Sequence, residues 1–331
     1  MAARALPILA TMAADVGAWA ETASVLARLR VVADELGTDF NAIGLALPAL
    51  GAAPARFARI RVTDWDSAAQ RVAILAPMAP ADDLEQADLE RRVAELGRVA
   101  GLDPQLPRLA LMRQRPGRHF LELETWPVPG GLTVTWHGVG AVVLAAEQAR
   151  LRELGVPDAA LEPFLERLRF LGPELDGLSD CQRTGGAAWW VARRGFDADE
   201  RALADGYSRI DTLAGELGVG APQRRLFERI HPVLAGGRRQ LASIAVDAEG
   251  TQPWIGVEYG PQTWENTLRV LNGLLPGEIT GKRLGAFAGA TGADGVSALE
   301  LILSAERPRV RVAVDLGGAR GQGSLDAILS G

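Results

Sequence analysis

The chain has almost none of the residue types on which several common kinds of functional site depend. Among its 331 residues there is one cysteine, Cys181, so neither an internal disulfide nor a cysteine-based metal cluster can form. We therefore expect a cytoplasmic protein in which Cys181 is a small buried hydrophobic residue. The three histidines, His119, His137 and His231, are too widely spaced to suggest a metal site.

Other absences exclude whole classes of protein. No apolar run reaches the roughly 18 residues of a membrane-spanning helix, and the net charge of -6 argues against nucleic acid binding through a basic surface. Asp15 interrupts the apolar N-terminus, which favours a first amphipathic helix over a signal peptide. There is no Walker A loop, no dinucleotide-binding glycine pattern and no nucleophile elbow.

Lysine is also scarce. Lys282 is the only lysine, and nearly all the positive charge of the chain comes from arginine. Any anion site must therefore be built mostly from guanidinium groups. Hydrophobic residues make up 48% of the chain, which is enough for a large core. No Pro/Ser-rich linker divides the sequence, so we predict one domain over residues 1–331.

A unit of two strand-like runs followed by one or two helices recurs about five times along the chain. The last copy is the clearest, since aliphatic residues occupy every second position in 298–303 and 309–315. The predicted strands are 57–65, 71–77, 108–114, 119–126, 132–136, 178–183, 187–194, 240–247, 253–259, 282–290, 298–303 and 309–315. The predicted helices are 12–36, 82–100, 140–154, 158–170, 197–217, 222–235 and 263–274.

Alternation gives these strands one aliphatic face and one face with arginine, glutamate or tryptophan. A closed antiparallel barrel with helices over the aliphatic faces and a polar lumen fits this pattern. The alternative is a two-layer sheet with one solvated face, but tryptophan is costly to expose and often lines ligand cavities. The aliphatic residues expected beneath the helices are Ile60, Val62, Leu121, Leu123, Ile255, Val257, Leu299, Leu301, Val310 and Val312.

The repeated order of helix, strand, strand and helix resembles the ABBA-type aromatic prenyltransferases over most of the chain. The resemblance is one of pattern, and it implies an antiparallel ten-stranded β-barrel ringed by helices. It also implies transfer of a prenyl group from an allylic diphosphate to an aromatic acceptor, a small molecule or a peptide, in secondary metabolism. No cofactor is firmly implied, although Mg²⁺ can accompany the diphosphate.

The resemblance further implies a diphosphate held by strand arginine and lysine residues and a carbocation shielded by aromatic rings. Members of the family use several tyrosines as the shield, whereas this chain has only Tyr207 and Tyr259, and tryptophan can substitute. The candidate substrate-binding residues are Arg59, Arg61, Arg113, Arg183, Arg193, Tyr259, Lys282, Arg309, Arg311, Trp65, Trp126 and Trp254.

A proton acceptor is the remaining requirement, and in the family it is commonly a glutamate in the lumen. Glu122, Glu124, Glu258 and Glu300 all lie on the polar strand faces. We predict that one of Glu122, Glu124 and Glu258 takes the proton, because a carboxylate beside an aromatic wall is partly desolvated.

Two other hypotheses stay open. A catalytically silent binding or scaffold protein could share the repeat fold, with its lumen arginines and glutamates neutralising one another. A different α+β enzyme, whose site the sequence does not reveal, is the second.

Overall fold

The computed structural model describes residues 27, 30–35, 59–63, 71–77, 91, 94, 98, 118–125, 132–153, 156–171, 174–183, 188–196, 200–235, 240–247, 253–274 and 278–315. All statements below concern these residues.

Ten antiparallel strands form a closed barrel in the order β1-β10-β9-β8-β7-β6-β5-β4-β3-β2. The first and last strands pair with each other, Val62 of β1 lying opposite Val312 of β10. The strands are β1 (Arg59–Thr63), β2 (Arg71–Pro77), β3 (Arg118–Thr125), β4 (Leu132–Val143), β5 (Glu174–Arg183), β6 (Ala188–Phe196), β7 (Gln240–Asp247), β8 (Trp254–Tyr259), β9 (Ala298–Leu303) and β10 (Arg309–Asp315).

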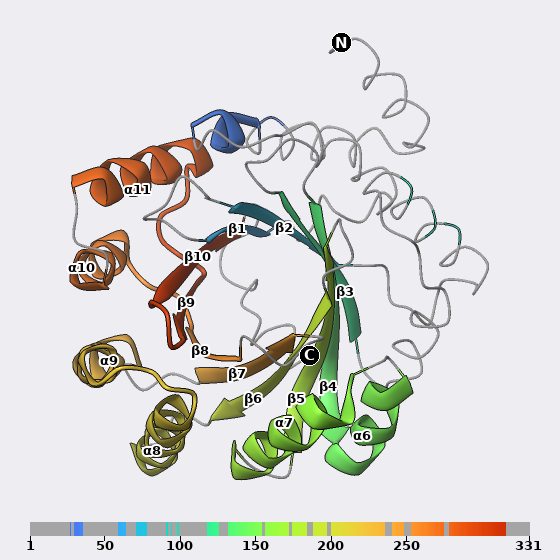
Figure 1. The fold of residues 1–331 in the computed structure, drawn as a ribbon. Coiled ribbons are helices and arrows are strands. Elements are labelled where there is room, and N and C mark those ends of the chain that lie inside the picture. The colour runs from blue at the N-terminus through green and yellow to red at the C-terminus, as the bar shows by residue number, and fades with distance from the viewer. Residues whose placement is uncertain are drawn as a thin grey trace.

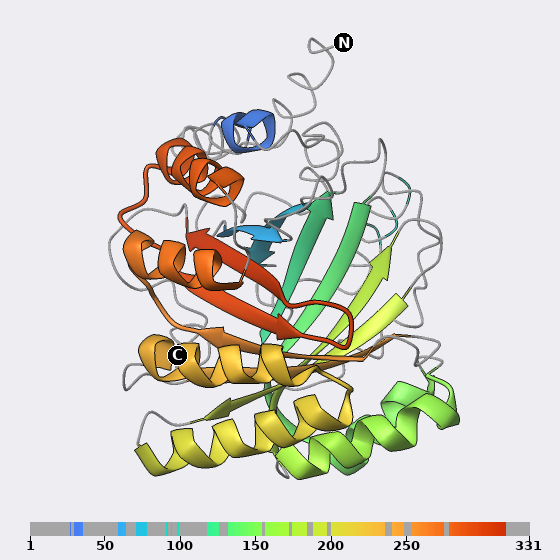
Figure 2. The ribbon, with the colours of Figure 1, turned by 60° about the vertical axis from the view of Figure 1, so that its left-hand side comes forward.

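The helices lie outside the ring of strands, as the view along the barrel shows (Figure 1). Seen from the side, they cross the outer surface in a single layer (Figure 2). They are α6 (Leu144–Glu153), α7 (Asp158–Leu171), α8 (Glu200–Glu216), α9 (Ala221–Ala235), α10 (Trp264–Leu274) and α11 (Glu278–Thr291). The predicted antiparallel α+β architecture, with helices on one face of the sheet, is confirmed.

The hydrophobic core lies between the sheet and this helical layer. The described aliphatic residues that the sequence placed there are no more than 1% exposed, namely Val62, Ile255, Val257, Leu299, Leu301, Val310 and Val312. Ile60, Leu121 and Leu123 occupy register positions of the same face. Burial of such side chains is the main favourable contribution to folding.

Local signals fix the ends of several helices. Gly218 follows α8 with a φ of 75°, a left-handed conformation that glycine adopts without steric cost. The amide of Val219 donates to the carbonyl of Ala214 at 2.9 Å, which closes a Schellman turn. At the start of α10, Oγ1 of Thr263 accepts a hydrogen bond from the amide of Asn266 at 3.1 Å, as an N-cap residue does.

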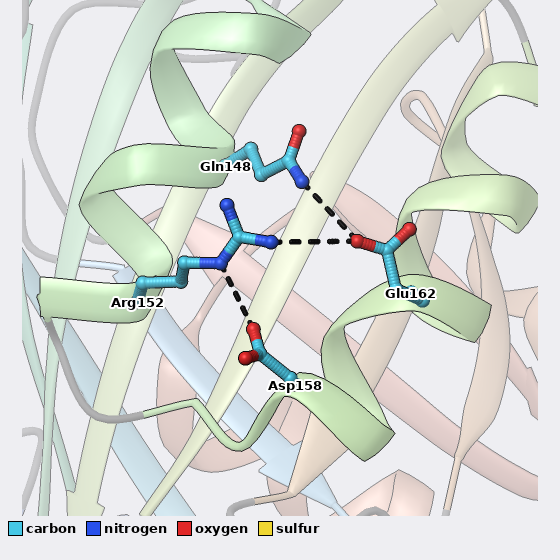
Figure 3. A network of polar contacts seen from close by, with 4 residues as sticks. All are labelled: Gln148, Arg152, Asp158 and Glu162. Atoms are coloured by element: carbon cyan, nitrogen blue, oxygen red, sulfur yellow. Dashed lines mark hydrogen bonds and ion pairs between the residues drawn. The ribbon is translucent and has the colours of Figure 1, made fainter.

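A polar network on the protein surface joins α6 to α7 (Figure 3). Arg152 donates from Nε to Oδ1 of Asp158 at 2.9 Å and lies 3.5 Å from Oε1 of Glu162, which also accepts from Gln148 at 3.2 Å. All three charged side chains are about half exposed or more, so the network contributes little to stability.

One predicted strand is wrong. The run 282–290 is part of α11, because Leu284, Phe287 and Thr291 are buried at helical spacing. The predicted strand 132–136 is confirmed within β4, which pairs with β3 and continues to Val143, so the helix predicted over 140–154 begins only at Leu144. The predicted strand 108–114 lies outside the described residues.

Candidate active site

The register of the closed sheet assigns each strand residue to the inner or the outer face. Residues directly opposite in an antiparallel pair project to the same side. Around β1, β10, β9 and β8, one inner row reads Thr63, Arg311, Glu300 and Glu258. The predicted polar face of these strands is therefore the inner face of the barrel.

Arg311 is the most constrained charged residue on this face. Its Nη1 donates to Oε2 of Glu300 at 2.9 Å, and its Cζ lies 5.2 Å from the centroid of the Trp254 ring. Arg311 and Glu300 are 9% and 5% exposed. A buried ion pair adds little net stability, but loss of either partner leaves an uncompensated charge. Arg311 is thus held in place by a carboxylate and an aromatic ring.

Beside this ion pair, the inner face is apolar. Trp254 packs with Val191 of β6 and Ile302 of β9, and all three are no more than 7% exposed. Gly256, on the same face of β8, has no side chain to fill the neighbouring space. Trp254 therefore contacts the charged pair Arg311–Glu300 on one side and the apolar residues Val191 and Ile302 on the other.

Arg61 has a different environment from that of Arg311. It is half-buried, and it lies opposite Ala73 of β2 and Ala313 of β10, whose side chains are single methyl groups. Arg309, also half-buried, lies opposite Ile302 on the same inner face.

Five further candidates are placed by register alone. Glu122 and Glu124 of β3 lie on the inner face, and Glu124 is opposite Ala73, the strand neighbour of Arg61. Arg183 is opposite Thr133, and Arg193 is opposite Ser243. Arg59 lies opposite Leu75 and Asp315 in the row next to that of Arg61. Arg113, Trp65 and Trp126 lie outside the described residues.

Two predicted substrate-binding residues are wrong. Lys282 is exposed on α11, because the segment that carries it is a helix outside the barrel. Tyr259 is fully buried on the outer face of β8, where its hydroxyl lies 2.9 Å from Nδ1 of His231 on α9. Tyr259 has the parity of Ile255 and Val257, and this signal was already present in the sequence.

The sequence interpretation overlooked part of the inner face. Register places Thr133, Thr135 and His137 of β4 there, together with Trp189 of β6. Thr135 is 5% exposed and lies opposite Glu122. The alternation of these residues with Val134 and Trp136 could have revealed them, because the run has a strict period of two.

Burial shifts the acidity of the residues behind β8. It lowers the pKa of His231 from 6.5 to about 4, and it raises the pKa of Tyr259 well above 10.0. Desolvation also raises the pKa of Tyr207, whose ring centroid lies 5.1 Å from that of His231. The histidine and both tyrosines are therefore uncharged at neutral pH.

No family model and no curated protein matches the sequence, but solved structures do match the fold. One is 5-dimethylallyl tryptophan synthase from Streptomyces coelicolor in complex with DMASPP and Trp, with a TM-score of 0.63 and 16% identity over 90% of this chain and 96% of that chain. Another is 6-dimethylallyltryptophan synthase from Micromonospora olivasterospora in complex with DMASPP and Trp, with a TM-score of 0.62 and 15% identity over 88% and 96%. The chain has the fold of the ABBA-type aromatic prenyltransferases.

Compared with what the ABBA-type resemblance implies, the inner face lacks a tyrosine shield. The chain has two tyrosines in all, and both lie outside this face, Tyr207 on α8 and Tyr259 behind β8. Trp254 of β8 lies on the inner face instead, and Trp189 of β6 and Phe120 of β3 occupy inner register positions.

Neither a metal cluster nor a membrane span is found in the part of the chain that the structure describes. No three histidine, cysteine, aspartate or glutamate side chains there lie close enough to hold a metal ion. None of the described helices combines the length and the apolar character that crossing a bilayer requires.

Proposed function

We propose that the protein transfers a prenyl group from an allylic diphosphate to an aromatic acceptor inside the barrel. The observation that supports this most directly is the inner row of arginine and glutamate beside Trp254, in a barrel whose outer face is buried under helices. Dimethylallyl tryptophan synthases, which share the fold, are solved with DMASPP and Trp in complex.

Arg61 is the first residue that we assign to the diphosphate. A diphosphate leaving group needs several fixed cations, and guanidinium groups bind it with paired hydrogen bonds. Arg61 is half-buried at an inner register position of β1, in the strand that closes the barrel against β10. Arg309 adds a second half-buried guanidinium on β10. Arg59, Arg183 and Arg193 complete the proposed set from their register positions.

The proposed reaction breaks the allylic C–O bond, and the electron pair leaves with the diphosphate. The resulting carbocation needs aromatic walls and the exclusion of water. Trp254 and Trp189 are the proposed aromatic walls, together with Trp65 and Trp126, which the sequence analysis names as candidates. A ring carbon of the acceptor then forms the new C–C bond, and the proton on that carbon must leave.

Glu258 is the acceptor of this proton that we favour. It is half-buried on the inner face of β8, the same face as Trp254. Glu300, which lies opposite Glu258, accepts a hydrogen bond from Arg311. Glu122 and Glu124 on β3 remain comparators, since they too lie on the inner face. A positioned general base typically contributes about 10²–10⁴-fold to a rate.

Binding of dimethylallyl S-thiolodiphosphate, measured by calorimetry, tests the proposal. We expect Arg61→Gln to weaken binding by about 10- to 150-fold, the equivalent of a charge-assisted hydrogen bond of roughly 1.5–3 kcal/mol. The matched control is Arg225→Gln, which changes an exposed arginine on α9 outside the barrel. Equal affinity of both variants and the wild type would refute the anion site.

The scaffold hypothesis is the second candidate, and the Glu300–Arg311 ion pair favours it locally. That pair makes one part of the interior charge-neutral without any ligand. The calorimetric titration distinguishes the prenyltransferase from the scaffold, because a scaffold of this kind binds no diphosphate analogue at all.

The proposal also includes a cytoplasmic location, a role in secondary metabolism and one domain over residues 1–331. Mg²⁺ dependence is tested by assay in EDTA.

A further inference from the structure

A second polar cluster lies behind β8, and the proposed reaction does not use it. It contains the chain's two tyrosines and a buried histidine, with ring centroids 5.1 Å apart for Tyr207 and His231, 5.3 Å for Phe227 and His231, and 5.7 Å for His231 and Tyr259. Within the described part of the chain, its polar contact is between Nδ1 of His231 and the hydroxyl of Tyr259, at 2.9 Å. Tyr259 is fully buried, so the hydroxyl depends on this partner.

The hydrogen bond joins α9 to the end of β8 at the residue next to Glu258. Side chains alternate across a strand, so the face that Tyr259 presents to the helices fixes the face that Glu258 presents to the interior. Both residues lie at the end of β8, which finishes at Tyr259. A strand end is where backbone order is most easily lost.

A separate contact holds the chain beyond this point. Nε2 of Gln262 donates to the carbonyls of Leu234 at 3.1 Å and Gly260 at 3.3 Å. Its backbone pairs with Val296 at 2.9 Å in both directions. The loop after β8 is therefore anchored independently. The end of the strand itself pairs with β7 and β9, where Tyr259 lies opposite Gln240 and Leu299, and the Tyr259–His231 hydrogen bond adds a side-chain contact that ties it to α9.

We propose that Tyr259, held by His231, is a positioning residue that fixes the height and orientation of Glu258 on the inner face of the barrel. This inference rests on the proposed function for its catalytic consequence, but the anchoring of β8 can be measured without it. Small displacements of a catalytic group cost rate, and an error of about 1 Å can cost on the order of 100-fold.

The functional test is a double-mutant cycle between Tyr259→Phe and Glu258→Gln. We expect Tyr259→Phe to lower kcat about tenfold in the wild-type background, with the affinity for dimethylallyl S-thiolodiphosphate unchanged. In the Glu258→Gln background the same change should alter kcat less than about twofold, because the group it positions is gone. Equal effects in both backgrounds would show a general structural role and overturn the proposal.

Amide hydrogen exchange provides a readout that needs no activity. Tyr259→Phe should speed exchange in residues 254–260 by about tenfold or more and leave β10 unchanged. Tyr207→Phe is the matched control, because it removes the hydroxyl of a cluster member on α8 that makes no hydrogen bond among the described residues. Exchange that responds equally to both variants would refute the anchor. If the wild-type protein transfers no prenyl group, the proposed function is refuted. The hydrogen-exchange rates of residues 254–260 would still show whether Tyr259 anchors β8.

Discussion

Strand β8 separates two buried polar clusters that differ in charge. On the inner side, Arg311 and Glu300 form an ion pair against Trp254. On the outer side, His231 and Tyr259 form a hydrogen bond between two uncharged groups.

The difference between the two clusters follows from what surrounds them. The outer cluster is enclosed by aromatic rings of α8 and α9, where a charge would have no compensation. The inner cluster lies in a sector that also contains Arg61, Arg309 and Glu258, so charged groups of both signs share this part of the interior. Charged groups therefore face the interior of the barrel at β8, and uncharged groups face the helices.

The largest expected effect is a loss of turnover, and it follows from a change on the inner side of β8. Glu258→Gln should slow turnover by about 10²–10⁴-fold, because a general base is lost, while the melting temperature is kept. Steady-state kinetics and calorimetric melting of the three variants Glu122→Gln, Glu124→Gln and Glu258→Gln check this. Normal turnover in all three would show that the glutamates are structural.

Breaking the inner ion pair should be the largest effect on stability. Glu300→Leu leaves the guanidinium of Arg311 buried without its carboxylate and should lower the free energy of unfolding by about 3–5 kcal/mol. The double variant with Arg311→Met should recover most of this loss. Arg311→Ala should destabilise the fold for the same reason, because it leaves the carboxylate of Glu300 buried without its guanidinium partner. Urea unfolding of the single and double variants measures the effect, and a double variant as unstable as Glu300→Leu would contradict it.

The outer cluster predicts a pH dependence. The unfolded chain protonates His231 near pH 6.5, whereas the folded protein does so only near pH 4. The stability that this residue contributes is therefore complete above pH 6.5 and is lost as the pH falls towards 4, by up to about 3 kcal/mol.

His231→Gln isolates this contribution from the other acids and bases of the chain. The stability gap between wild type and variant should narrow between pH 7 and pH 4, as measured by urea unfolding at each pH. A gap that stays constant would mean that His231 has the same pKa in the folded and the unfolded protein.

The smallest expected effect is confined to the outer layer. Gly218→Ala should lower the free energy of unfolding by about 1 kcal/mol, because alanine is strained at a φ of 75°. Affinity for dimethylallyl S-thiolodiphosphate should not change, since Gly218 ends α8 far from the inner row. Thermal melting and calorimetry check both parts, and an altered affinity would show that the helical layer and the interior are coupled.

Much of the fold could be predicted from local pattern. Period-two alternation identified the faces of β1, β8, β9 and β10, because each of these strands has one side against the helices. The same rule failed at 282–290, where glycine and alanine are small enough to suit either a helix or a strand. It also gave too short a strand at β4, which continues to Val143 through a register shift between Val139 and Val142.

The sequence by itself determined which residues share a face, because side-chain direction along a strand depends only on parity. It also determined that any anion site would be built mostly from arginine, since the chain has a single lysine. Tertiary structure alone decided which charges meet. Arg311 and Glu300 become partners because β9 and β10 pair in that register, and Arg61 lies between two alanines because β1 closes the barrel against β10 and β2. Tyr259 faces a histidine 28 residues earlier in the chain, and only the packing of α9 on β8 brings them together.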